Sequence, residues 1–420
     1  MTSMSTAPYS PTVNELFFAP LEQAITAASA PWPCPEFPDD VCIRMGVQRV
    51  LEGSESGRGF LQEHGLRFEN PPDYANYFAS LRSQRRCDLA REVNRSLITM
   101  AEAKVCDRLA DIPELARYAA FAADGHWHKA AVHDPRHDGS KMAVGHFYAS
   151  NLRTHTLRHL AAGEGLHEHD MSALKRIKPK GLRQDVPKGT RVLIIYDKAG
   201  IDFDYWDRCR RECAVYFINR VKEKMVFEWI EDCSWDKSDS RNHGVIADCK
   251  VHSRQGHVLR LVIYQDPLTG KVYEFLTNEP DLPPGVIAEL YRRRWEAEKV
   301  FDEIKNKLGQ KKAWGTTLVA KEAQALMIAL THNLLLCYEQ DLEQRHEVTN
   351  TSEDQRRSQR IDSAERACAK IGWPLSSLVL QARRATQRSV KFIRWLRHAI
   401  RDRCAESVAV ARLRELYALL

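Results

Sequence analysis

The sequence lacks the cysteine patterns that indicate a disulfide framework or a zinc finger. It contains 11 cysteines, an odd number, and no two of them have Cys-x-x-Cys spacing. Scattered cysteines of this kind favour reduced thiols in a cytoplasmic protein. The N-terminus also has no basic segment followed by an apolar one, so we do not expect secretion.

Long hydrophobic runs are missing as well. The longest apolar stretch, residues 323–336, is interrupted by Gln324, Thr331, His332 and Asn333. It is too short and too polar to span a bilayer, so we predict a core helix and no membrane partner. The glycine-rich segment 52–59 lacks the Lys-Ser/Thr ending of a phosphate loop, which argues against nucleotide binding there. We expect no small-molecule substrate.

The composition is that of an ordinary soluble globular protein with a basic character. The 420 residues are 44% hydrophobic and 28% charged, and this length predicts two or three domains. The net charge of +6 is modest, but basic residues cluster in 175–191, 299–312 and 383–403. A single basic run is more often a solvated face, whereas several such clusters fit a polyanionic partner.

The most informative segment is residues 286–308, which contains neither Pro nor Gly and predicts a helix. At about 100° per residue, Tyr291, Arg294, Glu298 and Lys305 fall within an arc of roughly 60° on one face. The neighbouring arc is apolar and would pack on a core. The helix therefore presents what a site for an anionic substrate and a divalent metal needs. The simpler alternative is a surface ion pair between Arg294 and Glu298.

Two aspartates follow apolar, strand-like segments earlier in the chain. Residues 191–196 end at Asp197, and residues 118–123 end at Asp124. Buried strands that end in an unpaired carboxylate are uncommon, because a charged group resists desolvation. A metal ion or a group of cations would remove this cost. For Asp124 a structural Asp-Gly turn is the alternative.

Histidines close to Asp124 could suggest another metal site. His126 and His128 would share one face of a strand and could hold zinc or copper. No cysteine or helical histidine pair completes such a site, so we favour exposed strand and loop histidines beside a polyanionic partner. Further histidines of this region are His133, His137, His167 and His169. Asp134 and Asp138 lie close to Asp124 and are alternatives to it as a candidate site residue.

The spacing of the four helix residues, Tyr-x2-Arg-x3-Glu-x6-Lys, resembles the signature of the DDE transposases of the IS-four type of bacterial insertion sequences. The resemblance covers about residues 115–340 and is densest at 276–284, 291–308 and 314–317. It implies an α/β fold, in which a ribonuclease H-like catalytic domain is interrupted by an all-β insertion before the glutamate helix and flanked by helical N- and C-terminal regions.

The resemblance also implies the chemistry. Asp124, Asp197 and Glu298 would be the catalytic residues and would bind two Mg²⁺ ions, for which Mn²⁺ can substitute. The expected enzyme is a transposase that hydrolyses DNA at the terminal inverted repeats of its own element. The freed 3′-hydroxyl then attacks target DNA. We expect a homodimer on DNA, in the bacterial cytoplasm and associated with the nucleoid.

The remaining residues of the signature face would contact DNA. By resemblance, Tyr291, Arg294 and Lys305 lie near phosphates at the cleaved end. Trp295 could stack on an extruded base, although packing in the core is the favoured interpretation. Two alternatives to an active transposase are a transposase-derived DNA-binding protein without catalysis and a metal-dependent nuclease of the same fold. An intact acid triad disfavours the first, and the signature face disfavours the second.

Patterns along the chain predict its division into regions. We expect a partly disordered segment 1–40, a helical domain 41–115 for DNA-end binding or dimer contacts, a catalytic domain 116–213 and 279–340, a β-rich insertion 214–278, and a basic helical region 341–420. Predicted helices include 41–51, 74–85, 89–109, 153–162 and 205–212, predicted strands include 145–148, 214–220, 225–231, 245–251, 257–264 and 271–277, and 339–363 is a predicted polar linker.

Overall fold

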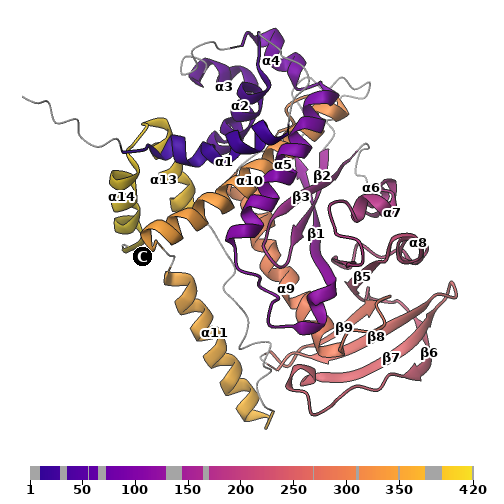
Figure 1. The fold of residues 1–420 in the computed structure, drawn as a ribbon. Helices are drawn as coiled ribbons and strands as arrows, with labels where there is room; N and C mark the ends of the chain where they lie inside the picture. Colours follow the sequence, from indigo (N-terminus) through magenta and orange to yellow (C-terminus); the bar gives the residue numbers. More distant parts are fainter. Residues whose placement is uncertain are drawn as a thin grey trace, which may run out of the picture.

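A nine-stranded sheet organises the fold, with helices packed on both of its faces (Figure 1). The order of the strands is β3-β2-β1-β4-β5-β9-β8-β7-β6. This structure is a computed structural model, and it describes residues 10–28, 36–54, 56–64, 72–128, 144–163, 170–267, 269–308, 312–348, 351–373 and 390–418.

The first half of the sheet is mixed. It contains β1 (Tyr118–His128), β2 (Val144–Asn151), β3 (Leu157–Ala162), β4 (Arg191–Ile195) and β5 (Val215–Arg220). The first three strands pair antiparallel, whereas β4 and β5 run parallel to β1. The nearly continuous apolar sequences of β1 and β4 suit this block, because helices cover both strands on both faces.

The second half is an antiparallel meander of β6 (Phe227–Asp232), β7 (Val245–Ser253), β8 (Val258–Gln265) and β9 (Val272–Thr277). It joins the first half because β9 pairs antiparallel with β5. These strands lie where the sequence predicts them. The predicted β-rich segment 214–278 also includes β5, but β5 pairs in parallel with β4 and so continues the first block.

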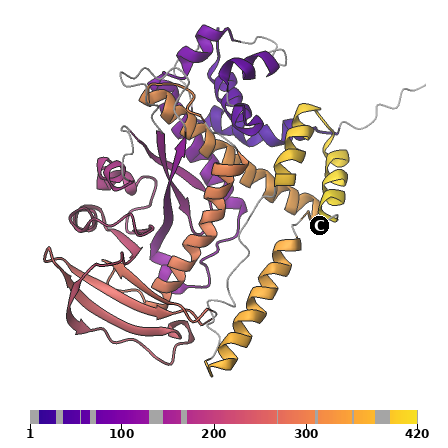
Figure 2. The same cartoon turned by 180° about the vertical axis from the view of Figure 1, so that it is seen from behind.

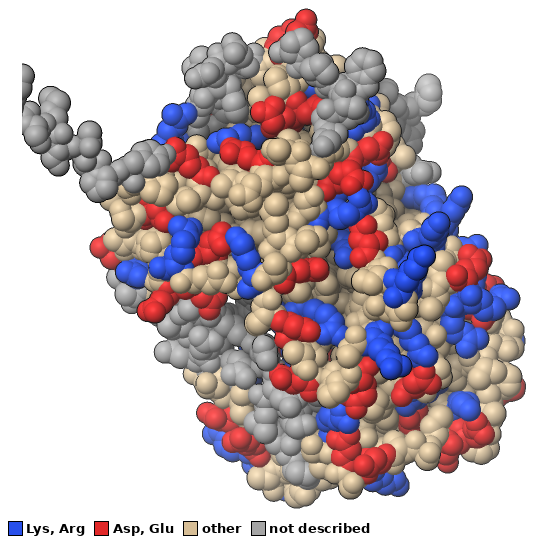
Figure 3. Space-filling view, in the orientation of Figure 1, with Lys and Arg blue, Asp and Glu red and all other residues tan. Residues whose placement is uncertain are grey.

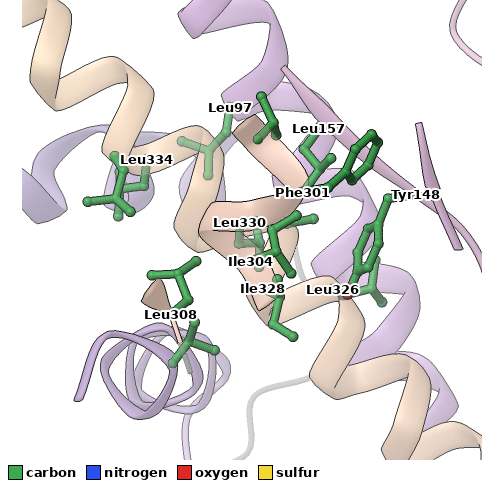
Figure 4. Packing of buried hydrophobic residues seen from close by; sticks show 14 of the residues in the cluster. Leu97, Tyr148, Leu157, Phe301, Ile304, Leu308, Leu326, Ile328, Leu330 and Leu334 are labelled. Atoms are coloured by element: carbon green, nitrogen blue, oxygen red, sulfur yellow. The ribbon is translucent and has the colours of Figure 1, made fainter. Parts of the chain in front are cut away.

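One face of the sheet carries the helices α5 (Gln84–Lys104), α9 (Pro284–Asp302) and α10 (Leu318–His346). Figure 2 shows α9 and α10, in orange tones, lying across this face. In Figure 4, Phe301 and Ile304 lie in one cluster with Leu330 of α10 and with Tyr148 of β2. α10 is buried over most of its length, as the interrupted apolar stretch predicts.

The opposite face carries α6 (Asp170–Arg176), α7 (Pro179–Leu182) and α8 (Phe203–Cys213). The ring of Trp206 on α8 is fully buried and stacks on Phe217 of β5, with centroids 5.2 Å apart. Asp202 caps the start of α8, because its side chain accepts a hydrogen bond from the backbone N–H of Tyr205.

The N-terminal region is helical from an earlier point than predicted. Its helices are α1 (Val13–Ala27), α2 (Asp39–Glu52), α3 (Gly57–His64) and α4 (Tyr74–Ser80). The prediction of a partly disordered segment 1–40 missed α1, although Thr12 and Glu15 form a capping box at its start. Buried Phe17 explains why α1 is held, because its ring contacts Tyr338 of α10.

The C-terminal region contains α11 (Thr351–Lys370), α13 (Val390–Arg401) and α14 (Glu406–Ala418). In both ribbon views α11 stands beside the main body, and its C-terminal end lies near the meander (Figures 1 and 2), where the charge of Asp266 acts on Cys368. The predicted polar linker 339–363 is wrong, because α10 and α11 occupy most of it. Two short 3-10 helices, Pro113–Arg117 and Ser240–Asn242, and a π turn, Glu303–Lys307, complete the elements of the described residues. Within the ranges described above, no helix is long and apolar enough to cross a membrane.

The predicted helix 153–162 is also wrong. Leu157–Ala162 forms strand β3, which pairs with β2 at the edge of the sheet. The local sequence favours a helix, but pairing with β2 and cover from α10 override this preference. His155 adopts a positive φ of 62° in the turn that makes this pairing possible.

Candidate active site

Asp124 lies on β1, and Asp197 follows the end of β4, the neighbouring parallel strand, by two residues. In the register of β1 and β4, Tyr118 lies opposite Arg191 and Ala122 lies opposite Ile195. Continued by two residues, this register brings Asp124 opposite Asp197. Neighbouring strands lie about 4.8 Å apart. β1 does not end at Asp124, as the apolar run suggests, but continues to His128 by pairing with β2.

The two carboxylates also belong to the face of the sheet on which α9 lies. Ala122 of β1 and Ile195 of β4 are buried in the same core as the apolar residues of α9. Side chains alternate along a strand, so residues two positions further on return to the same face. Contacts of α9 with β1, β4 and β5 place the glutamate helix over these strands.

Asp124 is held by a cation of the signature face. Its Oδ2 lies 2.8 Å from Nζ of Lys305, and its Oδ1 accepts a hydrogen bond of 2.9 Å from the backbone N–H of Gly125. About a quarter of its side chain is exposed. The structure therefore brings together the first acid and the last residue of the signature, which are 181 positions apart.

Asp197 is held by backbone and amide groups. Its Oδ1 accepts a hydrogen bond of 2.7 Å from the backbone N–H of Ala199, which closes a turn after β4. Its carbonyl oxygen accepts a hydrogen bond of 2.6 Å from the amide of Asn219 on β5. Asn219 is fully buried. Sequence reasoning missed it, although a polar residue inside the strand-like run 215–220 was the available signal.

Glu298 makes the ion pair that the simpler interpretation of the helix predicts. Its Oε1 lies 2.7 Å from a terminal nitrogen of Arg294, four residues earlier. The two partners are unlike in exposure, because the side chain of Arg294 is 7% exposed and that of Glu298 is 51% exposed. The cation is therefore anchored in the protein, whereas the carboxylate can move without disturbing the core.

Tyr291 connects the signature face to the strands below it. Burial raises the pKa of its phenol, while the neighbouring cations Arg294 and Arg220 act in the opposite direction and Asp197 reinforces the rise. The guanidinium of Arg294 lies 5.3 Å from the centre of the Tyr291 ring. Arg220, at the end of β5, is a second residue that sequence reasoning missed, and it brings another cation to the same place.

Trp295 is not packed in the core, contrary to the favoured interpretation. Its side chain is 45% exposed, and one side of the ring meets Tyr273 of β9 edge-on at 6.2 Å. It therefore lies at the edge of the candidate site with an exposed aromatic surface.

The acids are paired with donors and are not gathered around one point. Among the residues that the structure describes, no group of three or more His, Cys, Asp and Glu side chains could hold a metal ion. Lys305 and Arg294 supply positive charge to Asp124 and Glu298. The side chains of His126 and His128 lie outside the described part of the chain, as do His133, Asp134, His137, Asp138, His167 and His169.

Comparison with known families identifies the class of the protein. Residues 122–334 match the family model of the transposase DDE domain, a range that covers half of the 420 residues. The chain therefore belongs to the transposase DDE-domain family, which supports a transposase function with DNA as the partner. The matched range contains Asp124, Asp197 and Glu298. A search of the curated proteins found no match.

Proposed function

We propose that the chain is an active DDE transposase of the IS-four type. It hydrolyses phosphodiester bonds at the terminal inverted repeats of its element and then transfers the freed 3′-hydroxyl into target DNA, as a homodimer on DNA. The observation that carries this proposal is the pairing of Ala122 on β1 with Ile195 on β4 beneath α9, the helix that carries Glu298. Asp124 and Asp197 each follow one of these paired residues by two positions.

The sheet supports the finer fold assignment. We take the mixed block β3-β2-β1-β4-β5 with its helices as the ribonuclease H-like catalytic domain. The antiparallel meander β6–β9 is then the all-β insertion, because it lies between β5 and the glutamate helix, where the resemblance implies it. With β5 in the catalytic block, the insertion begins after Arg220.

The donor set fits a hard divalent cation. Asp124, Asp197 and Glu298 offer carboxylate oxygens, which Mg²⁺ and Mn²⁺ prefer, and no cysteine or histidine is needed. When bound, two such ions activate water and stabilise the leaving oxygen of the phosphodiester. The exposed carboxylate of Glu298 has freedom to leave Arg294 and join the aspartates.

The cations of the site would then contact phosphates of the DNA. Arg294, once free of Glu298, offers a planar fork for two phosphate oxygens, and its burial keeps it oriented. Lys305 offers a point charge from its position beside Asp124. Tyr291 supplies a hydroxyl donor, and the exposed face of Trp295 is available for stacking on a base.

A basic surface flanks the end of β4 and suits the DNA backbone. Figure 3 shows Lys and Arg side chains gathered over α6–α8. The exposed basic residues of this surface are Lys175, Arg176, Lys178, Lys180, Lys188, Lys198, Arg208, Arg210 and Arg211. Acidic side chains are interspersed, so the surface attracts phosphates without forming one uniform patch. We propose that DNA lies along it on the way to the acids.

The decisive experiment is Mg²⁺-dependent cleavage of DNA that carries the inverted repeat flanking the gene. We expect the wild-type protein to cut at the repeat and Glu298→Ala to bind the same DNA without cutting. Glu228→Ala is the matched control, because it removes an exposed carboxylate from β6, the outer strand of the meander. Cutting that Glu298→Ala leaves intact would mean that the active site lies elsewhere.

One observation favours the alternative of a catalytically silent DNA-binding protein. Lys305 and Arg294 already neutralise two of the three acids without a metal ion. In the same assay, this alternative predicts that the wild type binds the repeat and never cuts it.

A further inference from the structure

The glutamate helix changes its winding just before Lys305. The α-helix ends at Asp302, and Glu303–Lys307 forms a single π turn. The N–H of Leu308 donates to the carbonyl oxygen of Glu303, five residues back, at 2.9 Å. One extra residue in a turn rotates the following side chains by about 100° relative to a continuous helix. The sequence predicts no such break. π turns are rare and frequently lie at functional sites.

A buried acid fastens this turn on its inner side. The side chain of Glu303 is buried, and its Oε1 lies 2.9 Å from Nδ1 of His332 on α10. The other ring nitrogen of His332, Nε2, lies 2.9 Å from the carbonyl oxygen of His155 in the turn between β2 and β3. The imidazole thus connects the π turn to the edge of the sheet.

Both ring nitrogens of His332 face oxygen atoms. The carbonyl oxygen of His155 can only accept a hydrogen bond, so Nε2 carries a proton and donates it. Nδ1 and Oε1 of Glu303 are likewise within hydrogen-bond distance, at 2.9 Å. Removing either partner leaves a buried polar group without its bond, which is costly in a core. The pair therefore holds the π turn in one position.

The outer side of the same turn presents Lys305 to Asp124. Lys305 follows Glu303 by two residues, so the two side chains leave the turn on opposite sides. We propose that Glu303 and His332 are positioning residues that keep Nζ of Lys305 at the carboxylate of Asp124. The importance of this position for catalysis rests on the function proposed above, whereas the position itself does not.

Three of the four polar residues that interrupt the apolar sequence of α10 bind segments outside this helix. His332 binds the π turn, Gln324 binds the backbone of Trp314 and Lys312 after that turn, and Asn333 binds the backbone of Leu157 on β3. Asn333 is as buried as His332, but its hydrogen bonds go to Leu157 and Asn94. It is therefore a matched control that weakens the packing of α10 without releasing the π turn.

The position of Lys305 is tested without DNA. The purified full chain is treated briefly with acetic anhydride, and the labelling rate of each lysine is measured by mass spectrometry. An amine in contact with a carboxylate is poorly accessible to the reagent. We expect His332→Ala and Glu303→Gln to raise the labelling of Lys305 about threefold or more, with the smaller rise in Glu303→Gln, which keeps hydrogen-bonding capacity. Asn333→Ala should leave it unchanged.

Lys250 on β7 is the internal reference, because global loosening of the fold raises its labelling as well. If His332→Ala raises the labelling rates of both Lys305 and Lys250, the fold has loosened as a whole. The labelling rate of Lys305 in Glu303→Gln then decides whether the proposal holds. Labelling of Lys305 that stays unchanged in Glu303→Gln, or that rises equally in Asn333→Ala, overturns the proposal.

Cleavage kinetics then test whether the position matters for the reaction. At saturating DNA we expect Glu303→Gln to lower the cleavage rate about tenfold in the wild-type background and less than about twofold when Lys305→Ala is already present. Equal effects in both backgrounds would refute action through Lys305. A wild-type protein that never cuts DNA would refute the proposed function. The labelling rates would still show whether Glu303 and His332 hold Lys305 at Asp124.

Discussion

A buried ion pair joins the β meander to the segment that leads into the glutamate helix. Nε and a terminal nitrogen of Arg260 on β8 contact the two carboxylate oxygens of Asp248 on β7 at 2.8 and 2.6 Å. Asp248 is 1% exposed and Arg260 is 8% exposed. Arg260 also donates to the carbonyl oxygen of Leu282, at 2.7 Å, just before α9 begins.

Asp248→Ala removes the only carboxylate in contact with this guanidinium among the described residues and leaves a buried charge uncompensated. Breaking a buried pair on one side costs about 3–5 kcal/mol of unfolding free energy. We expect about 3 kcal/mol, at the lower end of that range, because Arg260 keeps its carbonyl partner. Asp248→Ala should also lower the unfolding temperature.

The control lies on the same strand. Lys250 lies 2.6 Å from Glu231, but both side chains are about half exposed, so in Lys250→Ala water hydrates the carboxylate in place of the ammonium group. Urea unfolding followed by tryptophan fluorescence and circular dichroism measures both variants, and coincident transitions are required for a comparison of free energies. An equal, small loss of stability in Asp248→Ala and Lys250→Ala would refute the argument from burial.

Two further predictions concern charge. The double variant Lys178→Ala, Lys180→Ala should make the binding of duplex DNA less dependent on salt. The slope of log K against log salt should fall in magnitude by about 0.9 for each phosphate that the variant no longer neutralises. An unchanged slope in a salt titration would mean that DNA binds elsewhere. Burial lowers the pKa of His159 to about 3, with Arg91 acting in the same direction. In the unfolded chain His159 has its ordinary pKa of 6.5, so the unfolded state binds a proton on this imidazole at a higher pH than the folded state does. The free energy of unfolding therefore falls as the pH drops from 6.5 to 3. His159→Gln should flatten that fall by up to about 1.4 kcal/mol per pH unit in denaturation curves, and identical pH profiles would contradict it.

Local sequence patterns predicted the positions of most strands of the sheet and of the glutamate helix. A nearly continuous apolar run marks β4, and alternating or β-branched patterns mark the meander strands, since these strands bury one or both faces. The absence of Pro and Gly from residues 286–308 marks most of α9, which begins two residues earlier, at Pro284. Segment 153–162 shows the limit of such patterns, because an edge strand with helix-forming residues is decided by its neighbours and not by its own preference.

The sequence by itself determined the order and spacing of the acids and of the Tyr-Arg-Glu-Lys face, and this was enough to predict the transposase family. Such signals are local, since a helix or strand repeats its own geometry along the chain. Which partner each side chain meets was decided only by the tertiary structure. Asp124 contacts Lys305, and Glu303 contacts His332. The packing of α9 and α10 on the sheet, together with a single π turn, brings together these residues, which are far apart in the chain.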